Sequence, residues 1–138
     1  MREFEIYIDG ASKGNPGPAG VGVVICQDWQ VVKNIYSFIG EATNNVAEYS
    51  ALIEGLKECL RLKACNIKIN SDSQLLCHQL NLIYKIKAPH ILKLYLEARS
   101  LMKNFKKVIV EHIPREKNTG ADKLANKAIK EAAVLSNR

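Results

Sequence analysis

Long apolar runs are absent from this sequence. The longest covers only residues 21–26, far short of the roughly 20 residues that a membrane-spanning helix needs. The first five residues, Met-Arg-Glu-Phe-Glu, also lack the apolar core of a secretory leader, because an acidic residue directly follows the first basic one. We therefore expect a cytoplasmic protein with no membrane partner.

Cysteines at metal-binding spacing are also missing. None of the four lies in a C-x-x-C motif or at zinc-ligand spacing from a histidine; they are Cys26, Cys59, Cys65 and Cys77. A zinc site is therefore not expected. Reduced thiols are the ordinary state of cysteine in the cytoplasm, and the sequence leaves a disulfide open.

Basic residues are scarce in the first half of the sequence and abundant in the second. Residues 1–72 contain 7 basic and 9 acidic side chains, whereas residues 73–138 contain 13 basic and 5 acidic ones. This asymmetry favours a polyanionic partner, with nucleic acid first. The alternative is a lysine-rich surface that is only solvated.

Apolar periodicity predicts five strands and four helices within one domain that spans residues 1–138. Alternating or continuous apolar residues mark strands at residues 4–9, 20–26, 31–39, 67–69 and 108–110. Apolar spacings of three and four mark helices at residues 46–62, from residue 73, at residues 91–101 and at residues 122–135. The order βββαβααβα predicts an α/β fold with a mixed five-stranded sheet and helices packed on both faces.

Four acidic residues lie at the ends of predicted elements or beside polar loops: Asp9, Glu48, Asp72 and Asp122. Each has a local explanation, since acidic residues favour helix N-termini and Asp is common in turns. Jointly they indicate more. If the first and fourth strands are neighbours, all four carboxylates meet at one edge of the sheet. Carboxylates so close need cations, and Mg²⁺ is the hard, oxygen-binding cation expected there.

Four segments resemble type 1 ribonuclease H, in the order of that family. They are YIDGASKGNPGPAG at residues 7–20, TNNVAEY at residues 43–49, SDSQ at residues 71–74 and HIPREKNTGADKLA at residues 112–125. The resemblance implies a ribonuclease H-like fold and a monomeric endonuclease that hydrolyses the RNA strand of RNA–DNA hybrids. The expected products carry 5′-phosphate and 3′-hydroxyl ends.

The resemblance also implies a two-metal site with Mg²⁺, for which Mn²⁺ can substitute. By this likeness Asp9 bridges both ions. Asp122 holds the ion that activates the attacking water, and Glu48 and Asp72 complete the other.

Polar residues of the same motifs match positions that contact the hybrid. Asn15, Asn44, Asn45 and Gln74 match residues that touch the minor groove, where the 2′-hydroxyl distinguishes RNA from DNA. Thr43 matches a residue that contacts a phosphate of the DNA strand. The alternative is that these side chains only cap loops.

The sequence departs from many relatives at residues 84–89, which are too few for a basic, tryptophan-bearing protrusion. The only tryptophan is Trp29, far from this segment. Exposed lysines could supply phosphate contacts in its place, namely Lys85, Lys87, Lys93 and Lys123. The alternative is that these lysines only solvate the surface.

A second departure concerns the segment before Asp122. His112 has the separation of a family histidine that assists turnover, but it directly follows an apolar strand and is better explained as a strand-end residue. We expect Arg115, within a polar loop at residues 115–121, to take the auxiliary role by binding phosphate or aiding product release. Arginine does not act as a general base at neutral pH.

Two rival functions remain open for this fold. A non-catalytic binding module does not need the four carboxylates. A DNA-directed nuclease, such as a resolvase or integrase core, does not need the amides that read a 2′-hydroxyl.

Overall fold

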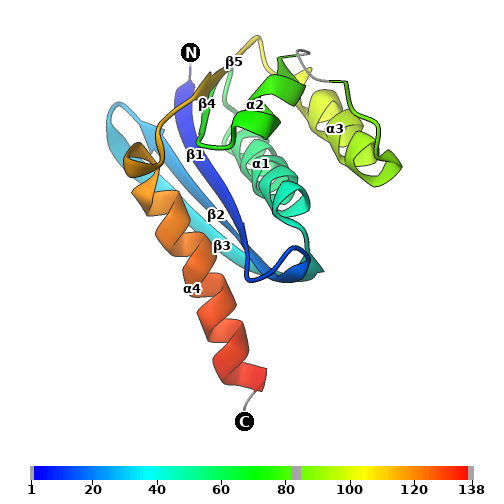
Figure 1. Cartoon of the computed structure of the whole chain (residues 1–138). Helices are drawn as coiled ribbons and strands as arrows, with labels where there is room; N and C mark the ends of the chain where they lie inside the picture. Colours follow the sequence, from blue (N-terminus) through cyan, green and yellow to red (C-terminus); the bar gives the residue numbers. More distant parts are fainter. Residues whose placement is uncertain (1, 82–84, 137–138) are drawn as a thin grey trace.

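Five strands form one mixed sheet in the order β3-β2-β1-β4-β5 (Figure 1). The computed structural model describes residues 2–81 and 85–136, so Tyr84 of the predicted short connection lies outside the described residues. The strands are β1 (Glu3–Ser12), β2 (Gly17–Gln27), β3 (Gln30–Ala42), β4 (Asn66–Ser71) and β5 (Lys107–His112). The helices are α1 (Asn44–Arg61), α2 (Gln74–Leu80), α3 (Pro89–Met102), the short 3-10 helix η1 (Arg115–Lys117) and α4 (Thr119–Ser136).

The central strand is β1, because it pairs with β2 on one side and with β4 on the other. The β1–β2 and β2–β3 pairs are antiparallel, whereas the β1–β4 and β4–β5 pairs are parallel. The predicted meander and its helical crossovers are therefore confirmed. The parallel ladder between β1 and β4 ends at Ile8 and Ser71, one residue before Asp9 and Asp72. This register brings the two aspartates to the same edge.

Alternation along β1 separates the two faces of the sheet. Ile6 and Ile8 are fully buried on the face that α1 covers, where a Cβ added to Gly55 of α1 would lie 3.2 Å from the Ile6 side chain. Asp9 is paired with Gly22, which places its side chain on the face that α4 covers. Figure 1 shows α1 and α4 on opposite sides of the sheet, as the sequence predicted.

Two glycines let these helices approach the centre of the sheet. A Cβ on Gly10 would overlap the backbone of Ala47 and Glu48 at the start of α1. A Cβ on Gly22 would lie 2.7 Å from the Ala125 backbone nitrogen in α4. Because neither glycine has a side chain, both helices come close to the sheet near Asp9. Helix α1 thereby brings Glu48 to this place, and α4 brings Asp122.

Several predicted boundaries are wrong: β2 begins at Gly17, β3 continues to Ala42 and α3 begins at Pro89. Two further errors lie beside the acidic residues. The first strand does not end at Asp9 but continues to Ser12, since its pairing with β2 outlasts its pairing with β4. Residues 115–121 are not a polar loop, because η1 begins at Arg115 and α4 begins at Thr119. The Asp122 backbone nitrogen donates to the Asn118 carbonyl at 3.1 Å, so the first turn of α4 is already closed there.

All four cysteines are free thiols, and Cys59 and Cys77 are buried. Across residues 2–81 and 85–136, no helix combines the length and the apolar character needed to cross a bilayer.

Candidate active site

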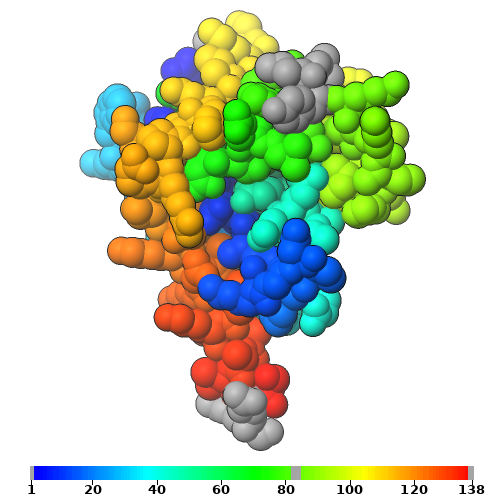
Figure 2. Space-filling model, in the orientation of Figure 1, coloured from blue at the N-terminus to red at the C-terminus, as the bar shows by residue number. Residues whose placement is uncertain are grey.

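A cleft of about 460 Å³ opens where β1, α1 and α4 meet. Figure 2 shows β1 (dark blue) at the floor of a hollow between α4 (orange) and the green and cyan atoms of α2 and α1. All four predicted carboxylates line this cleft, namely Asp9, Glu48, Asp72 and Asp122. Residues from four distant parts of the sequence therefore share one site.

Three of the carboxylates form a tight group. Asp9, Glu48 and Asp72 each offer an oxygen atom, and these atoms lie within 4.8 Å of one another. Asp9 and Glu48 are buried, with 6% and 8% of their surface exposed, whereas Asp72 is partly exposed. Asp122 lines the same cleft from α4 but is not part of this close group.

Burial and mutual repulsion disfavour the charged forms of this group. Burial first, and then the nearby Asp72 and Asp122, raise the pKa of Asp9 to about 7. Burial, followed by the charges of Asp9 and Asp72, holds the pKa of Glu48 well above its ordinary value. The ionised forms of these carboxylates would therefore repel one another in a poorly solvated place, and the group retains a proton unless a cation is bound.

The chain itself does little to neutralise this charge. Among the residues that the structure describes, no salt bridge joins Lys13 or Arg115 to a carboxylate, although both line the cleft. Among the same residues, Oε2 of Glu48 is buried without a hydrogen-bond partner. An oxygen-only donor set with an unsatisfied buried carboxylate oxygen fits a hard divalent cation.

Two asparagines that the sequence analysis did not select hold the aspartates in place. Asn118 is buried, and its Nδ2 donates to the Ile8 carbonyl at 2.9 Å and to Oδ2 of Asp72 at 3.3 Å. Asn126 Nδ2 donates to Oδ1 of Asp122 at 3.3 Å and to its carbonyl at 2.9 Å. Asn126 lies four residues after Asp122 on the predicted helix, and this spacing was the signal that could have found it. Asn118 lies before the predicted helix and bonds to Asp72, so the sequence carried no such signal for it.

The predicted hybrid-contacting residues of the first two motifs lie together where the β1–β2 loop meets the start of α1. Oδ1 of Asn15 accepts from the Asn44 backbone nitrogen at 3.0 Å, and Oδ1 of Asn44 accepts from the Ser12 backbone nitrogen at 3.1 Å. Thr43 caps α1, since its hydroxyl accepts from the Val46 nitrogen at 3.3 Å. These contacts bear out loop capping for Asn15, Thr43 and Asn44 and do not test whether they also bind substrate.

The remaining predicted contact residues differ in their surroundings. Asn45 is half-buried, and its Oδ1 has no hydrogen-bond partner among the described residues. Gln74 is exposed at the first residue of α2, directly after the loop that contains Asp72. The four lysines proposed for phosphate contacts, Lys85, Lys87, Lys93 and Lys123, are exposed and do not line the cleft.

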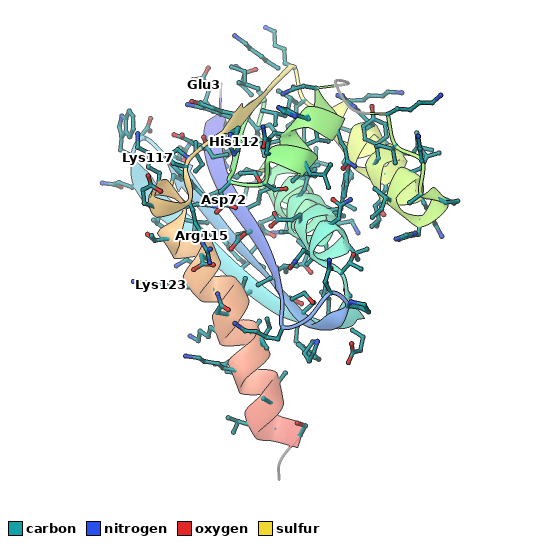
Figure 3. All side chains as sticks on the ribbon, in the orientation of Figure 1. Glu3, Asp72, His112, Arg115, Lys117 and Lys123 are labelled. Atoms are coloured by element: carbon teal, nitrogen blue, oxygen red, sulfur yellow. The ribbon has the colours of Figure 1, made fainter. Side chains whose placement is uncertain are left out.

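Of the two candidate auxiliary residues, only Arg115 lines the cleft. Figure 3 shows Arg115 of η1 close to Asp72, which follows β4. His112 is exposed at the last residue of β5, and its Nε2 lies 3.2 Å from the Asp72 carbonyl oxygen. This contact agrees with a strand-end role for His112, as predicted.

The family model described as "Reverse transcriptase-like" matches residues 7–128. The bifunctional protein Rv2228c of Mycobacterium tuberculosis is 44% identical over 130 residues, which are 93% of this chain and 36% of that protein. The N-terminal RNase H domain of Rv2228c, solved as a fusion with maltose binding protein, matches with a TM-score of 0.94 and 41% identity over 99% of both chains.

Two further relatives share the fold over nearly the whole chain. Ribonuclease HI of Halobacterium salinarum is 41% identical over 127 residues, which are 91% of this chain and 64% of that protein. The crystal structure of RNase H1 from this archaeon matches with a TM-score of 0.91 and 39% identity, covering 94% of this chain and 98% of that one. LC11-RNase H1 in complex with an RNA/DNA hybrid matches with a TM-score of 0.89 and 37% identity, covering 94% and 99%.

The chain thus spans 36% and 64% of the length of these two curated relatives. The family match nevertheless covers most of the chain, and the two solved relatives match 99% and 94% of it with TM-scores of 0.94 and 0.91. The chain belongs to the type 1 ribonuclease H family.

Proposed function

We propose that this chain is a divalent-metal-dependent endoribonuclease that hydrolyses the RNA strand of RNA–DNA hybrids and leaves 5′-phosphate and 3′-hydroxyl ends. The observation that carries the proposal is the group of buried carboxylates at the cleft, whose oxygen atoms lie within 4.8 Å of one another and lack a cationic partner among the described residues. Support comes from the family and from a relative solved with an RNA/DNA hybrid.

The donor set supports Mg²⁺ as the metal, with Mn²⁺ as a substitute, because all available ligands are carboxylate oxygens. Two bound ions would stabilise the attacking and leaving oxygens of an in-line phosphodiester hydrolysis. Asp9 is proposed to contact both ions, since it lies on β1, the central strand of the sheet, and is close enough to Asp72 and Asp122 for both to raise its pKa. Asp122 would hold the ion on the side of the attacking water, and Glu48 and Asp72 the ion on the leaving side.

The loops beside the cleft are proposed to read the hybrid. The hydrogen bonds of Asn15 and Asn44 use their Oδ1 atoms, so these bonds do not occupy the Nδ2 donors. Those donors can approach acceptors in a minor groove, and Asn45, next to Asn44 in α1, would join them through its amide. Gln74 would extend this set from α2, and Thr43 would contact a phosphate of the DNA strand.

Phosphate contacts outside the cleft are proposed for the exposed lysines of the α2–α3 connection and of α3. Lys85, Lys87 and Lys93 are exposed on this part of the chain, and Lys123 is exposed on α4. Because all four carboxylates come from one chain, we also propose that the protein acts as a monomer.

One cleavage experiment tests the proposal. A hybrid labelled on either strand is incubated with the protein and Mg²⁺, with Mn²⁺ or with EDTA, beside duplex DNA and duplex RNA of the same sequence. We expect cleavage of the RNA strand of the hybrid alone, only with added metal, and products that a kinase can label after removal of their 5′-phosphate. Equal cutting of duplex DNA would favour a DNA-directed nuclease, and hybrid binding without cleavage would favour a binding module.

A further inference from the structure

A chain of hydrogen bonds links the β1–β2 loop to the carboxylate of Asp122. Nζ of Lys13 donates to Oδ1 of Asn126 at 2.8 Å, across a sequence separation of 113 residues. Asn126 in turn donates from Nδ2 to Oδ1 of Asp122 at 3.3 Å and to the Asp122 carbonyl at 2.9 Å. All three side chains line the cleft, so this chain borders the site on the α4 side.

The chemistry of the three groups fixes the orientation of the amide. An ammonium group only donates hydrogen bonds, and an ionised carboxylate only accepts them. Asn126 satisfies both, because its Oδ1 faces Lys13 and its Nδ2 faces Asp122. The opposite orientation would place the amide N–H groups against an ammonium and its oxygen against two acceptors, so Lys13 selects the orientation that serves Asp122.

We propose that Asn126 is a positioning residue for Asp122 and that Lys13 acts through it. Asp122 lies outside the close group of three, although its carboxylate is near enough to Asp9 to raise the pKa of Asp9; among the described residues, Asn126 is the neutral amide that donates to it. Asn126 would hold the Asp122 carboxylate toward the cleft, and Lys13 would hold Asn126. The inference rests on the proposed function, since it assigns a metal-binding role to Asp122.

A purely structural contact is the competing explanation. Asn126 and Asp122 lie four residues apart on α4, where a side-chain hydrogen bond adds only a few tenths of a kcal/mol to helix stability. A local helix contact would not depend on Lys13, which comes from the other end of the sequence. The two explanations therefore differ in whether Lys13 and Asn126 affect metal binding together.

The test compares metal binding by purified variants without any substrate. Mn²⁺ binding is measured by calorimetry for the wild type, Asn126→Ala, Lys13→Ala, Lys13→Arg and the double Ala variant. Asn104→Ala is the control, because the Asn104 amide also donates to backbone carbonyls, those of Ser100 and Leu101 in the preceding helix α3, but does not line the cleft. Thermal unfolding of each variant shows that it is folded.

We expect Asn126→Ala to weaken Mn²⁺ binding by about 10-fold, the ordinary cost of removing a hydrogen-bond partner of a ligand. Lys13→Ala should lose a smaller part of the affinity, Lys13→Arg should restore most of it, and the double variant should lose no more than Asn126→Ala alone. In hybrid cleavage, Asn126→Ala should raise the Mg²⁺ concentration for half-maximal rate while the KM for the hybrid stays within about twofold.

Unchanged Mn²⁺ affinity in Asn126→Ala, or additive losses in the double variant, would overturn the proposal. A wild type that binds Mn²⁺ but does not cleave the hybrid would instead refute the proposed function, and the binding comparison would still decide the role of Asn126. A folded wild type that binds no Mn²⁺ at all would overturn both.

Discussion

Glu5 and Asp9 lie on the same face of β1, Glu5 toward the N-terminal end of the strand and Asp9 toward the C-terminal end, but their surroundings differ. At the N-terminal end, Glu5 lies 3.7 Å from the ammonium of Lys68, which also contacts Glu111 at 2.7 Å. Four residues along the same face, Asp9 lies beside Glu48 without a salt bridge among the described residues. The chain neutralises its acidic residues at one end and gathers them unpaired at the other.

The two acidic sites differ in energy because one is partly exposed and the other is buried. Glu5 and Lys68 are partly exposed, and exposed ion pairs of this kind contribute at most about 1 kcal/mol. Asp9 and Glu48 are buried, so leaving them charged and unpaired costs several times more. A protein does not retain such an arrangement for stability, which indicates that the end of β1 at Asp9 is built for a cationic ligand.

The largest expected effect comes from removing the carboxylate of Asp9, with removal of the Glu5 carboxylate as the control. Asp9→Asn should lower hybrid cleavage by at least about 1,000-fold, since metal-assisted charge stabilisation contributes several kcal/mol. Glu5→Gln is the matched control on the same strand and face, and its rate should stay within about twofold of the wild type. Initial rates and hybrid affinity are measured for both, and Asp9→Asn should still bind the hybrid. Full cleavage by Asp9→Asn would remove the metal assignment.

The second prediction concerns pH and metal removal. The pKa of Asp9 is raised from 3.8 to about 7, so the folded state holds a proton that the unfolded state releases. Without metal, stability should therefore fall as pH rises from about 4 to about 7 and change little above that, by an amount on the order of a few kcal/mol. Added Mg²⁺ should restore stability most strongly at pH 8, where the carboxylates are ionised.

Denaturant unfolding in EDTA and in Mg²⁺, across this pH range, checks the second prediction. Asp9→Asn should show a smaller fall in stability with pH and a smaller gain from Mg²⁺, whereas Glu5→Gln should behave like the wild type. Equal pH slopes in all three proteins would show that the unpaired group does not strain the fold.

A third prediction tests how α4 reaches the site. Gly22→Ala should destabilise the protein by about 1 to 3 kcal/mol, because the new methyl group would lie 2.7 Å from the Ala125 nitrogen and push α4 away. It should also weaken Mn²⁺ binding, since α4 carries Asp122. Gly120→Ala is the control, because its new Cβ would make an ordinary 3.4 Å contact with Val24. Chemical denaturation and calorimetry measure both effects, and a Gly22→Ala protein with wild-type metal affinity would contradict this account.

Much of this contrast between the two ends could be predicted from the sequence. Period-two alternation predicted β1. The expected pairing of the first and fourth strands predicted that Asp9, Glu48 and Asp72 meet at one edge of the sheet. The end of β1 was missed because the parallel ladder with β4 ends at Ile8, whereas the antiparallel ladder with β2 continues to Ser12. Local apolar pattern does not reveal which partner strand ends first.

The asparagines were missed for a different physical reason. Asn118 reaches Asp72 because α4 approaches the sheet closely over Gly22, whereas Asn126 contacts Asp122 within α4 itself. That approach depends on tertiary packing between residues about 100 positions apart in the sequence. The early start of α4 at Thr119 has a similar origin, since Asn118 is anchored to the Ile8 carbonyl of the central strand.

The smallest expected effect separates the two auxiliary candidates beside Asp72. Arg115→Ala should slow turnover by about 5-fold, because an exposed arginine that lines the cleft contributes roughly 1 kcal/mol to a phosphate contact. His112→Ala should change the rate by less than about twofold, since its ring contacts only a backbone carbonyl at the strand end. Steady-state turnover at saturating hybrid compares the two, and Arg115→Lys should recover part of the loss by keeping the charge. A larger loss in His112→Ala than in Arg115→Ala would reverse the assignment and place the auxiliary group on β5.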